Sequence, residues 1–243
     1  MTLSIIIPNI KFPRRTQLYS IPALAKNHVF SFFGASREKS LVNHNASQPH
    51  GIVVGDVAFS ADGLLVLGKT NALRFKGLRA PDPAGCTILV AFKTGKTIGD
   101  AGLVSYWSEA SMFDDSLARR IYSIWTSTST TFNGVPGVTS AAAGRVITPD
   151  TEYILSLTRA SKGNVSQLRV HNPDGSVAST HAITEYAGTT LPYASDVVFD
   201  IGTGSSAAQV GAYIKGAALW SGILSEAEIA AGAALMYQVI HPS

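Results

Sequence analysis

Short runs in which apolar and polar residues alternate dominate the chain from residue 51 onward, and they constrain the fold more than any other feature. In residues 153–159 the odd positions before the arginine are apolar, and in residues 166–171 the even positions are apolar. Such alternation gives a strand one buried and one exposed face, as in an antiparallel sheet. About eleven such runs predict an all-β fold, an antiparallel β-sandwich or barrel. They are residues 52–59, 64–67, 72–75, 86–93, 103–107, 121–131, 153–159, 166–171, 177–183, 197–201 and 210–220.

A hairpin signal separates two of these runs. Residues 172–175 read Asn-Pro-Asp-Gly, between Val170 and Val177. Asp-Gly readily supplies the positive φ angles of a tight turn. Residues 166–171 and 177–183 are therefore expected to be neighbouring antiparallel strands.

The last element is expected to be a short C-terminal helix, the one helix that the sequence predicts. Ser225 and Glu228 form a capping box, in which each side chain accepts a hydrogen bond from the other residue's amide. Leu224 and Ile229 complete a hydrophobic staple around this box. The helix is expected to run to about Val239 and to stop before the proline at position 242. The side chains expected to face the sandwich are Ile229, Leu235, Met236 and Val239.

Composition excludes several other classes of protein. The chain has 243 residues, of which 46% are hydrophobic and 14% charged, against about 25% charged in typical globular domains. This hydrophobicity excludes disorder, and no apolar run reaches the roughly 18 to 20 residues of a membrane helix. The single cysteine, Cys86, excludes a disulfide framework and a cysteine-based metal site.

The first 35 residues differ from the rest of the chain. Prolines at positions 8, 13 and 22 fix φ and remove amide donors, which prevents a continuous helix. Residues 1–40 hold six basic groups and one acid, whereas the other 203 residues hold 13 basic and 15 acidic groups. We therefore expect an extended N-terminal arm over residues 1–35 and one β domain over residues 36–243. Lys11, Arg14 and Arg15 are expected either to contact a neighbouring subunit or to be solvated.

The start of the chain carries neither a nucleic-acid signature nor an export signal. Nucleic-acid binding would need a longer basic stripe with interleaved aromatic residues. The short apolar stretch in residues 1–8 lacks the positively charged region and the cleavage site of a secretory signal. We therefore expect no nucleic-acid partner, and synthesis in a cytoplasm without export.

The C-terminal part of the chain resembles a known family. Residues 199–202 read Phe-Asp-Ile-Gly, residues 211–220 read Gly-Ala-Tyr-Ile-Lys-Gly-Ala-Ala-Leu-Trp, and residues 224–229 read Leu-Ser-Glu-Ala-Glu-Ile. This ending is similar to that of laminin-G-like, concanavalin A-like jelly-roll domains, and residues 53–59, 63–67, 73–75 and 87–92 look like that family's first strands. The resemblance covers roughly residues 35–243. It implies a jelly roll of two packed antiparallel sheets, and it carries fold much better than function.

Domains of this type occur in bacteriophage virions, and the chain looks like a phage or prophage structural protein. The analogy implies a tail-fibre, receptor-binding or decoration subunit that is made in the host cytoplasm and ends up in the virion. Its partners would be other virion subunits, reached through the arm, a second copy of itself in a homo-oligomer, and a glycan on the host surface. The alternative is a carbohydrate-binding module or a polysaccharide-degrading enzyme of the glucanase or lyase type.

No motif in the sequence predicts catalysis. A retaining glycosidase needs two carboxylates about 5 Å apart. The close acidic pairs are Asp114 with Asp115 in a loop, and Glu226 with Glu228, which the helix cap explains. The Gly-x-Ser-x-Gly pattern of a nucleophilic serine is missing too. We therefore expect a protein that is not an enzyme and that needs no cofactor.

Calcium is the usual metal of the family that the chain resembles, and one loop is a candidate for it. Residues 111–116 form the acid-dense loop, in which Asp114 and Asp115 would supply carboxylate ligands. The alternative is a solvated turn or a helix cap. The histidines lack both the i, i+4 spacing and the acidic partners of a metal site, so surface or hydrogen-bonded histidines are expected. They include His44, His50, His171 and His181.

Exposed aromatic side chains are the natural candidates for stacking on sugar rings. Tyr106, Trp107 and Trp125 lie in expected strands, and Tyr186 and Tyr193 lie in a later loop. For each of them the alternative is packing in the core. Trp220 is assigned to the core, because it ends a strand directly before the helix that docks on the sheet.

Overall fold

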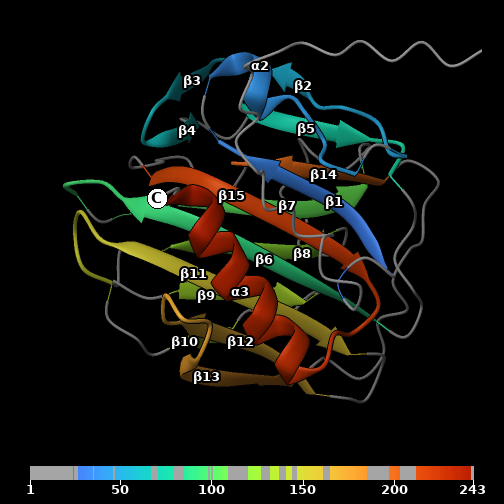
Figure 1. Ribbon diagram of the computed structural model, residues 1–243, viewed down its shortest axis with the longest axis vertical. Coiled ribbons are helices and arrows are strands. Elements are labelled where there is room, and N and C mark those ends of the chain that lie inside the picture. The colour runs from blue at the N-terminus through green and yellow to red at the C-terminus, as the bar shows by residue number, and fades with distance from the viewer. Residues whose placement is uncertain are drawn as a thin grey trace, which may run out of the picture.

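The computed structural model describes residues 24, 27–34, 36–45, 47–66, 71–78, 85–97, 99, 101–108, 120–126, 132–136, 141–143, 147–160, 165–184, 197–202 and 212–241. These residues form two antiparallel sheets that pack face to face, with one long helix outside the larger sheet (Figure 1). The predicted all-β sandwich is confirmed. No helix within these ranges is long and apolar enough to cross a membrane.

The larger sheet has eight strands among the described residues, and all of its pairs are antiparallel. One strand, β1 (His28–Phe33), pairs with β15 beside the main path. Along that path the order is β13 (Val177–Thr184), β12 (Val165–His171), β11 (Glu152–Ala160), β6 (Gly85–Thr94), β15 (Ala212–Ser221), β4 (Gly63–Val66) and β3 (Val57–Ser60).

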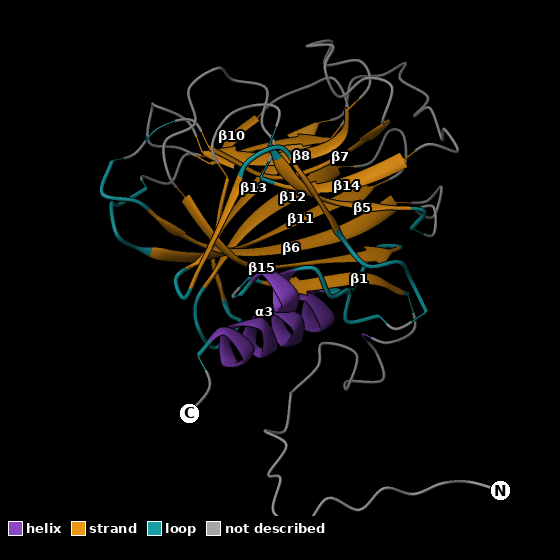
Figure 2. Ribbon diagram, turned by 90° about the horizontal axis from the view of Figure 1, so that it is seen from above, coloured by secondary structure: helices purple, strands orange, loops and turns teal. Residues whose placement is uncertain are grey.

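The smaller sheet has seven described strands, again in antiparallel pairs. Figure 2 shows the two sheets edge-on, with the helix outside the larger one. In order, the seven strands are β10 (Ala141–Ala143), β9 (Phe132–Pro136), β8 (Arg120–Thr126), β7 (Ala101–Ser108), β14 (Val197–Ile201), β5 (Ala72–Lys76) and β2 (Ile52–Val54).

Several elements differ from the expected runs. The run 52–59 is two strands, β2 and β3, because Gly55 adopts a φ of 70° and the chain passes from one sheet to the other. The strands β9 and β10 were not predicted, since their glycine, proline and alanine residues are poor strand formers. A four-residue helix, α2 (Arg37–Ser40), follows β1 and was also not predicted.

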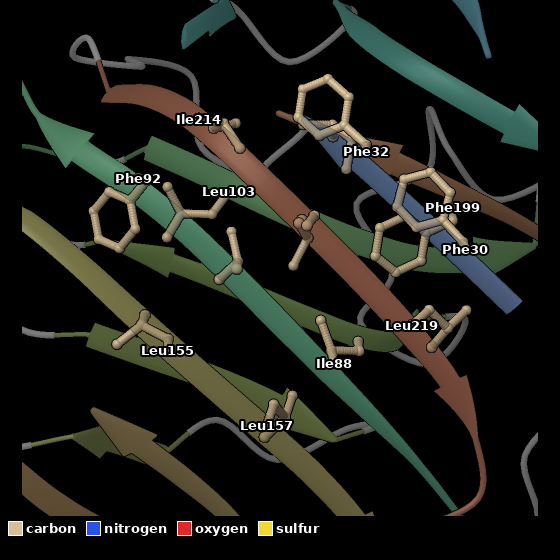
Figure 3. Close-up of a cluster of buried hydrophobic side chains, with 14 of the residues drawn as sticks. Phe30, Phe32, Ile88, Phe92, Leu103, Leu155, Leu157, Phe199, Ile214 and Leu219 are labelled. Carbon is tan, nitrogen blue, oxygen red and sulfur yellow. The ribbon is translucent and has the colours of Figure 1, made fainter. Parts of the chain in front are cut away.

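The core between the sheets is built from every second residue of the central strands. Figure 3 shows rings and aliphatic side chains of both sheets meeting there. The ring of Phe30 in β1 lies 4.3 Å from that of Phe75 and 5.1 Å from that of Phe199, in centroid distance. Because Phe75 and Phe199 belong to the smaller sheet, Phe30 joins the two layers.

The position of the strand β1 shows that the arm was expected to extend too far along the chain. His28–Phe33 was assigned to the arm, but it pairs with β15, and Phe30 and Phe32 are fully buried. Leu24 is also fully buried, and its carbonyl accepts a 2.7 Å hydrogen bond from the indole nitrogen of Trp220. The sandwich therefore includes the chain from Leu24 onward. An arm can comprise only the residues before it, which lie outside the described ranges.

The helix α3 (Glu226–Ile240) begins as its sequence predicts. The Ser225 amide donates to Glu228 Oε2 at 2.7 Å, and the Glu228 amide donates to Ser225 Oγ at 3.3 Å, which confirms the capping box. Of the side chains expected to face the sandwich, Ile229, Leu235 and Met236 are buried in one cluster with Trp220, while Val239 is half-buried. The core position of Trp220 is confirmed.

The predicted hairpin connects β12 and β13. Gly175 adopts a φ of 85° in its turn, as expected for the Asp-Gly pair. A Cβ atom at this position would collide with the carbonyl oxygen of Ala230 in α3. The turn therefore requires glycine both for its φ angle and for its close approach to the helix.

Candidate functional site

The structure places the three strand aromatics proposed as sugar contacts on neighbouring strands of the seven-stranded sheet. Tyr106 and Trp107 lie in β7, and Trp125 lies in β8. Trp107 pairs in register with Val198 of β14, whereas Trp125 pairs with Gly102 of β7. The two tryptophans are thus separated by roughly 17 Å along the strands, at about 3.4 Å per residue. Their side chains lie outside the described part of the structure.

The outer face of this sheet can be identified from its buried residues. Phe199 and Ile201 of β14 point into the core between the sheets. Because successive side chains of a strand alternate between faces, Val198 and Asp200 lie on the outer face. Arg74 of β5 lies there for the same reason, since Leu73 and Phe75 are in the core.

An ion pair is buried on this outer face. Arg74 Nε donates to Asp200 Oδ1 and Arg74 Nη2 donates to Asp200 Oδ2, each at 2.8 Å. The Arg74 side chain is 4% exposed and that of Asp200 is 0% exposed. Such a bidentate pair fixes both strands in register, and its charges compensate each other away from water.

The ion pair lies close to Tyr106 and Trp107 in the sheet. Asp200 pairs in register with Ser105, the residue before Tyr106, and Ser105 is itself 1% exposed. Sequence reasoning did not single out Arg74 or Asp200. The available signal was a lone charge between two apolar residues in each strand, in Leu-Arg-Phe and Phe-Asp-Ile.

The described strands of this sheet do not supply the acids of a glycosidase. Asp200 is the one acidic residue in the seven strands, and Arg74 occupies both of its carboxylate oxygens. A second carboxylate about 5 Å away, which retaining hydrolysis needs, is missing from these strands. The same strands contain three basic residues, Arg74, Lys76 and Arg120.

The outer face of the eight-stranded sheet is occupied by the helix. Figure 1 shows α3 lying across β15, β6 and β11, and Figure 2 shows it on the far side from the smaller sheet. Its buried side chains pack against the outer-face residues Leu89, Ala91, Ile154, Ala218 and Trp220. Among the described elements, the seven-stranded sheet is thus the one whose outer face has no helix on it.

A second polar cluster lies at the C-terminal end of α3. Glu152 of β11 binds Lys215 of β15, and His241 Nε2 lies 2.5 Å from Glu152 Oε2. Burial alone would raise the pKa of Glu152, but the hydrogen bonds from Lys215 and His241 outweigh it and hold that pKa below its usual range. The cluster ties the end of the helix to two strands.

The histidines have structural environments. His171 Nε2 lies 2.8 Å from Ser156 Oγ, and His171 Nδ1 lies 3.1 Å from the Gly175 carbonyl oxygen, which accepts its proton. The Ser156 hydroxyl therefore donates to Nε2. Burial lowers the pKa of His171. The described residues contain no group of three or more histidine, cysteine, aspartate and glutamate side chains that could hold a metal ion.

Several predicted site residues lie outside the described ranges. They are the arm residues Lys11, Arg14 and Arg15, the calcium candidates Asp114 and Asp115, and the loop tyrosines Tyr186 and Tyr193.

Acidification is expected to destabilise the fold through its buried histidines. Burial lowers the pKa of His28 from 6.5 to about 4, with a smaller contribution from His44. Between these values the unfolded chain binds more protons than the folded chain, so the free energy of unfolding falls as the pH drops from about 6.5 to 4. His28 alone accounts for about 3 kcal/mol at pH 4. Urea unfolding at pH 7, 5.5 and 4 measures this loss. It should be smaller in His28→Gln, and an equal loss in that variant would contradict the assignment.

No family model matches the chain, and no curated protein matches its sequence. Solved structures with similar folds include Trypanosoma rangeli sialidase, with a TM-score of 0.60 at 16% identity over 87% of this chain and 33% of that one. The receptor-binding domain of botulinum neurotoxin C/D mosaic serotype gives a TM-score of 0.60 at 9% identity, over 87% and 51% of the two chains. The botulinum neurotoxin serotype D ligand-binding domain, solved with N-acetylneuraminic acid, gives 0.57 at 10% identity, over 91% and 52%.

These similarities concern the fold. All three neighbours are less than 25% identical to this chain, and the chain spans about a third of the sialidase and half of the toxin domains. The β-sandwich of the chain is thus shared with proteins of lectin-like fold. What those proteins bind or cleave is not transferred by the similarity itself.

Proposed function

We propose that the chain is a glycan-binding β-sandwich without catalytic activity, which binds through the outer face of its seven-stranded sheet. The observation that carries the proposal is this face itself, which has no described helix on it. Trp107 pairs in register with the outer-face residue Val198, and Trp125 lies in the neighbouring strand, whereas Tyr106 pairs with the core residue Phe199 and so belongs to the inner face. Aromatic rings over a rigid sheet offer stacking surfaces, and the ion pair between β5 and β14 fixes β14, the strand next to β7.

The single carboxylate in the described strands of the smaller sheet supports glycan binding rather than hydrolysis. Asp200 is engaged by Arg74 and has no acidic neighbour in the seven strands. Similarity to a sialidase does not oppose this, because about two thirds of that longer chain has no counterpart here. The competing function is a polysaccharide-degrading enzyme whose acids come from loops outside the described ranges.

Acidic glycans are the first ligands to test. The seven strands contain three basic residues and one acid, so they favour a ligand with negative charge. The neighbours of similar fold include structures solved with sialic acid and with N-acetylneuraminic acid. Sialylated oligosaccharides are therefore the class that we expect to bind.

A glycan array and a turnover assay on the same purified protein test the proposal. We expect sialylated glycans to be retained, with no release of sialic acid or of reducing ends over hours. Turnover would replace the proposal with the enzymatic alternative, and the absence of binding to every glycan would overturn it. Running the array with calcium and with EDTA tests the loop of Asp114 and Asp115 as a calcium site.

We propose further that the domain acts as a subunit of a bacteriophage or prophage virion, attached through the segment before Leu24. The support is the resemblance of the C-terminal sequence and the basic character of residues 1–40. Deleting residues 2–20 should abolish incorporation into particles while the sandwich stays folded. The deletion has to stop short of Leu24, because that residue is part of the packed structure. Normal incorporation of the shortened chain would contradict the anchoring role.

A further inference from the structure

The strand β13 is an edge of the eight-stranded sheet. Among the described strands it pairs with β12 alone, and it lies at the bottom border of the sheet in Figure 1. Proteins usually protect such an edge with lysine, proline, a bulge or a very short strand, because its unpaired amides and carbonyls can pair with another chain. The eight residues of β13, Val-Ala-Ser-Thr-His-Ala-Ile-Thr, contain no proline and no lysine, arginine or acidic residue. One register shift lies near its start, between the pairs Val170–Ser179 and His171–Val177, and from Ser179 onward the described pairing is regular.

Two polar groups on the inner side of β13 have no hydrogen-bond partner among the described residues. Leu168 and Val170 of β12 are in the core, and they pair in register with His181 and Ser179. Since paired residues share a face, Ser179 and His181 point to the inner side of the sheet. Ser179 Oγ and His181 Nε2 are buried atoms for which the described structure offers no hydrogen-bond partner. Buried polar atoms normally have one.

We propose that β13 pairs with β13 of a second copy of this chain, antiparallel about a two-fold axis at Thr180. The two-fold axis of such a pair is perpendicular to the sheet, so the inner faces of the two copies lie on the same side. Residues that point to the same face therefore pair with each other. The register centred on Thr180 places Ser179 opposite the second copy's His181, on the inner face, twice by symmetry. Each unpartnered hydroxyl thereby meets an unpartnered imidazole nitrogen at cross-strand distance.

The outer side of the same register is also compatible with pairing. It brings Ala178 opposite the second copy's Ala182 and Thr180 opposite its own equivalent, and all three residues are exposed in the single chain. These side chains are small and uncharged, so neither steric conflict nor like-charge repulsion opposes the approach. In registers centred on Ser179 or on His181, residues of like orientation also pair, but Ser179 no longer lies opposite the second copy's His181.

A charged residue at the proposed two-fold axis tests whether the dimer forms through β13. Sedimentation velocity over a range of concentrations should show a species of twice the 25.6-kDa chain mass. Thr180→Glu places two carboxylates face to face and should abolish that species, whereas the uncharged Thr180→Gln should retain it. Glutamate is tolerated within one chain, because Thr180 is exposed and its register partner is Arg169. Matching far-UV circular dichroism spectra of the two variants confirm that each chain folds.

Cysteine cross-linking tests the register. Thr180→Cys places two thiols opposite each other at the 4.5–5.5 Å Cα separation of an antiparallel pair, within the reach of a disulfide. Mild oxidation should therefore give a covalent dimer. Ala178→Cys is the matched control, because its equivalent lies four residues away along the partner strand, roughly 14 Å and out of reach. The native Cys86 is buried and does not compete.

The outcomes decide the proposal without reference to glycan binding. A dimer that is lost in Thr180→Glu, kept in Thr180→Gln and cross-linked by Thr180→Cys supports it. A chain that stays monomeric up to about 100 µM, well above the micromolar Kd range of ordinary specific contacts, overturns it. A dimer that persists in Thr180→Glu, or that cross-links equally through Ala178→Cys, overturns the β13 interface as well.

Discussion

Replacing Asp200 with asparagine is expected to lower the free energy of unfolding by about 3–5 kcal/mol, which is the usual effect of removing one partner of a buried ion pair. Asparagine preserves the shape of the side chain but removes its charge. The guanidinium of Arg74, which is 4% exposed and bonded at 2.8 Å through two nitrogens, is then left charged and uncompensated. Urea unfolding of the two proteins, followed by circular dichroism, measures the difference.

Two further variants distinguish this explanation from a general effect of losing a carboxylate. Asp150→Asn removes the partner of Lys93 from an exposed pair at 3.9 Å, and the loss should be below about 1 kcal/mol. The double replacement Arg74→Met with Asp200→Leu removes both charges, and it should recover most of the stability lost in Asp200→Asn. A loss under about 1 kcal/mol in Asp200→Asn would show that the pair is not buried as described.

Replacing Phe30 with alanine is expected to remove about 3–5 kcal/mol of stability, the range for deleting a buried phenylalanine ring. Phe30 is fully buried and contacts the rings of Phe75 and Phe199 across the sandwich. The result would confirm that β1 is part of the core rather than of an arm. Chemical unfolding at pH 7 gives the value.

The control for Phe30 is an exposed apolar residue. Ile223 is 49% exposed, and Ile223→Ala should change the free energy of unfolding by no more than about 0.5 kcal/mol. Deletion of residues 2–34 should prevent folding, because it removes β1 as well as Leu24, whereas deletion of residues 2–20 should not. A stable Phe30→Ala protein would place β1 outside the cooperative unit.

The fold was predictable where local chemistry and packing agree. The alternation in residues 153–159 specifies one buried face, and the capping box at Ser225 specifies where the helix begins. The strand β1 was misassigned because its residues, His-Val-Phe-Ser-Phe-Phe, are apolar on both faces and follow a segment rich in proline. The edge of β15 with which it pairs is contributed by residues almost 190 positions later, and no local pattern reports such a partner.

The candidate site was predictable only in part. Aromatic residues in strands can be read as possible sugar contacts, and Tyr106, Trp107 and Trp125 do fall on adjacent strands of one sheet. The pairing of Arg74 with Asp200 joins residues 126 positions apart, so it depends on the strand order, which the sequence does not reveal. Which of the two sheets carries a described helix on its outer face likewise follows from where α3 docks.

Binding of a sialylated glycan to variants of the seven-stranded sheet tests the central claim most directly. Titration calorimetry with the best ligand from the array should show at least tenfold weaker binding for Trp107→Ala or Trp125→Ala, or about 1.4 kcal/mol. The matched control is Tyr213→Ala, which removes a half-buried ring from the outer face of the other sheet, and it should bind as the unmodified chain does. Unchanged affinity in both tryptophan variants, or a loss in Tyr213→Ala alone, would contradict a glycan site on the seven-stranded sheet.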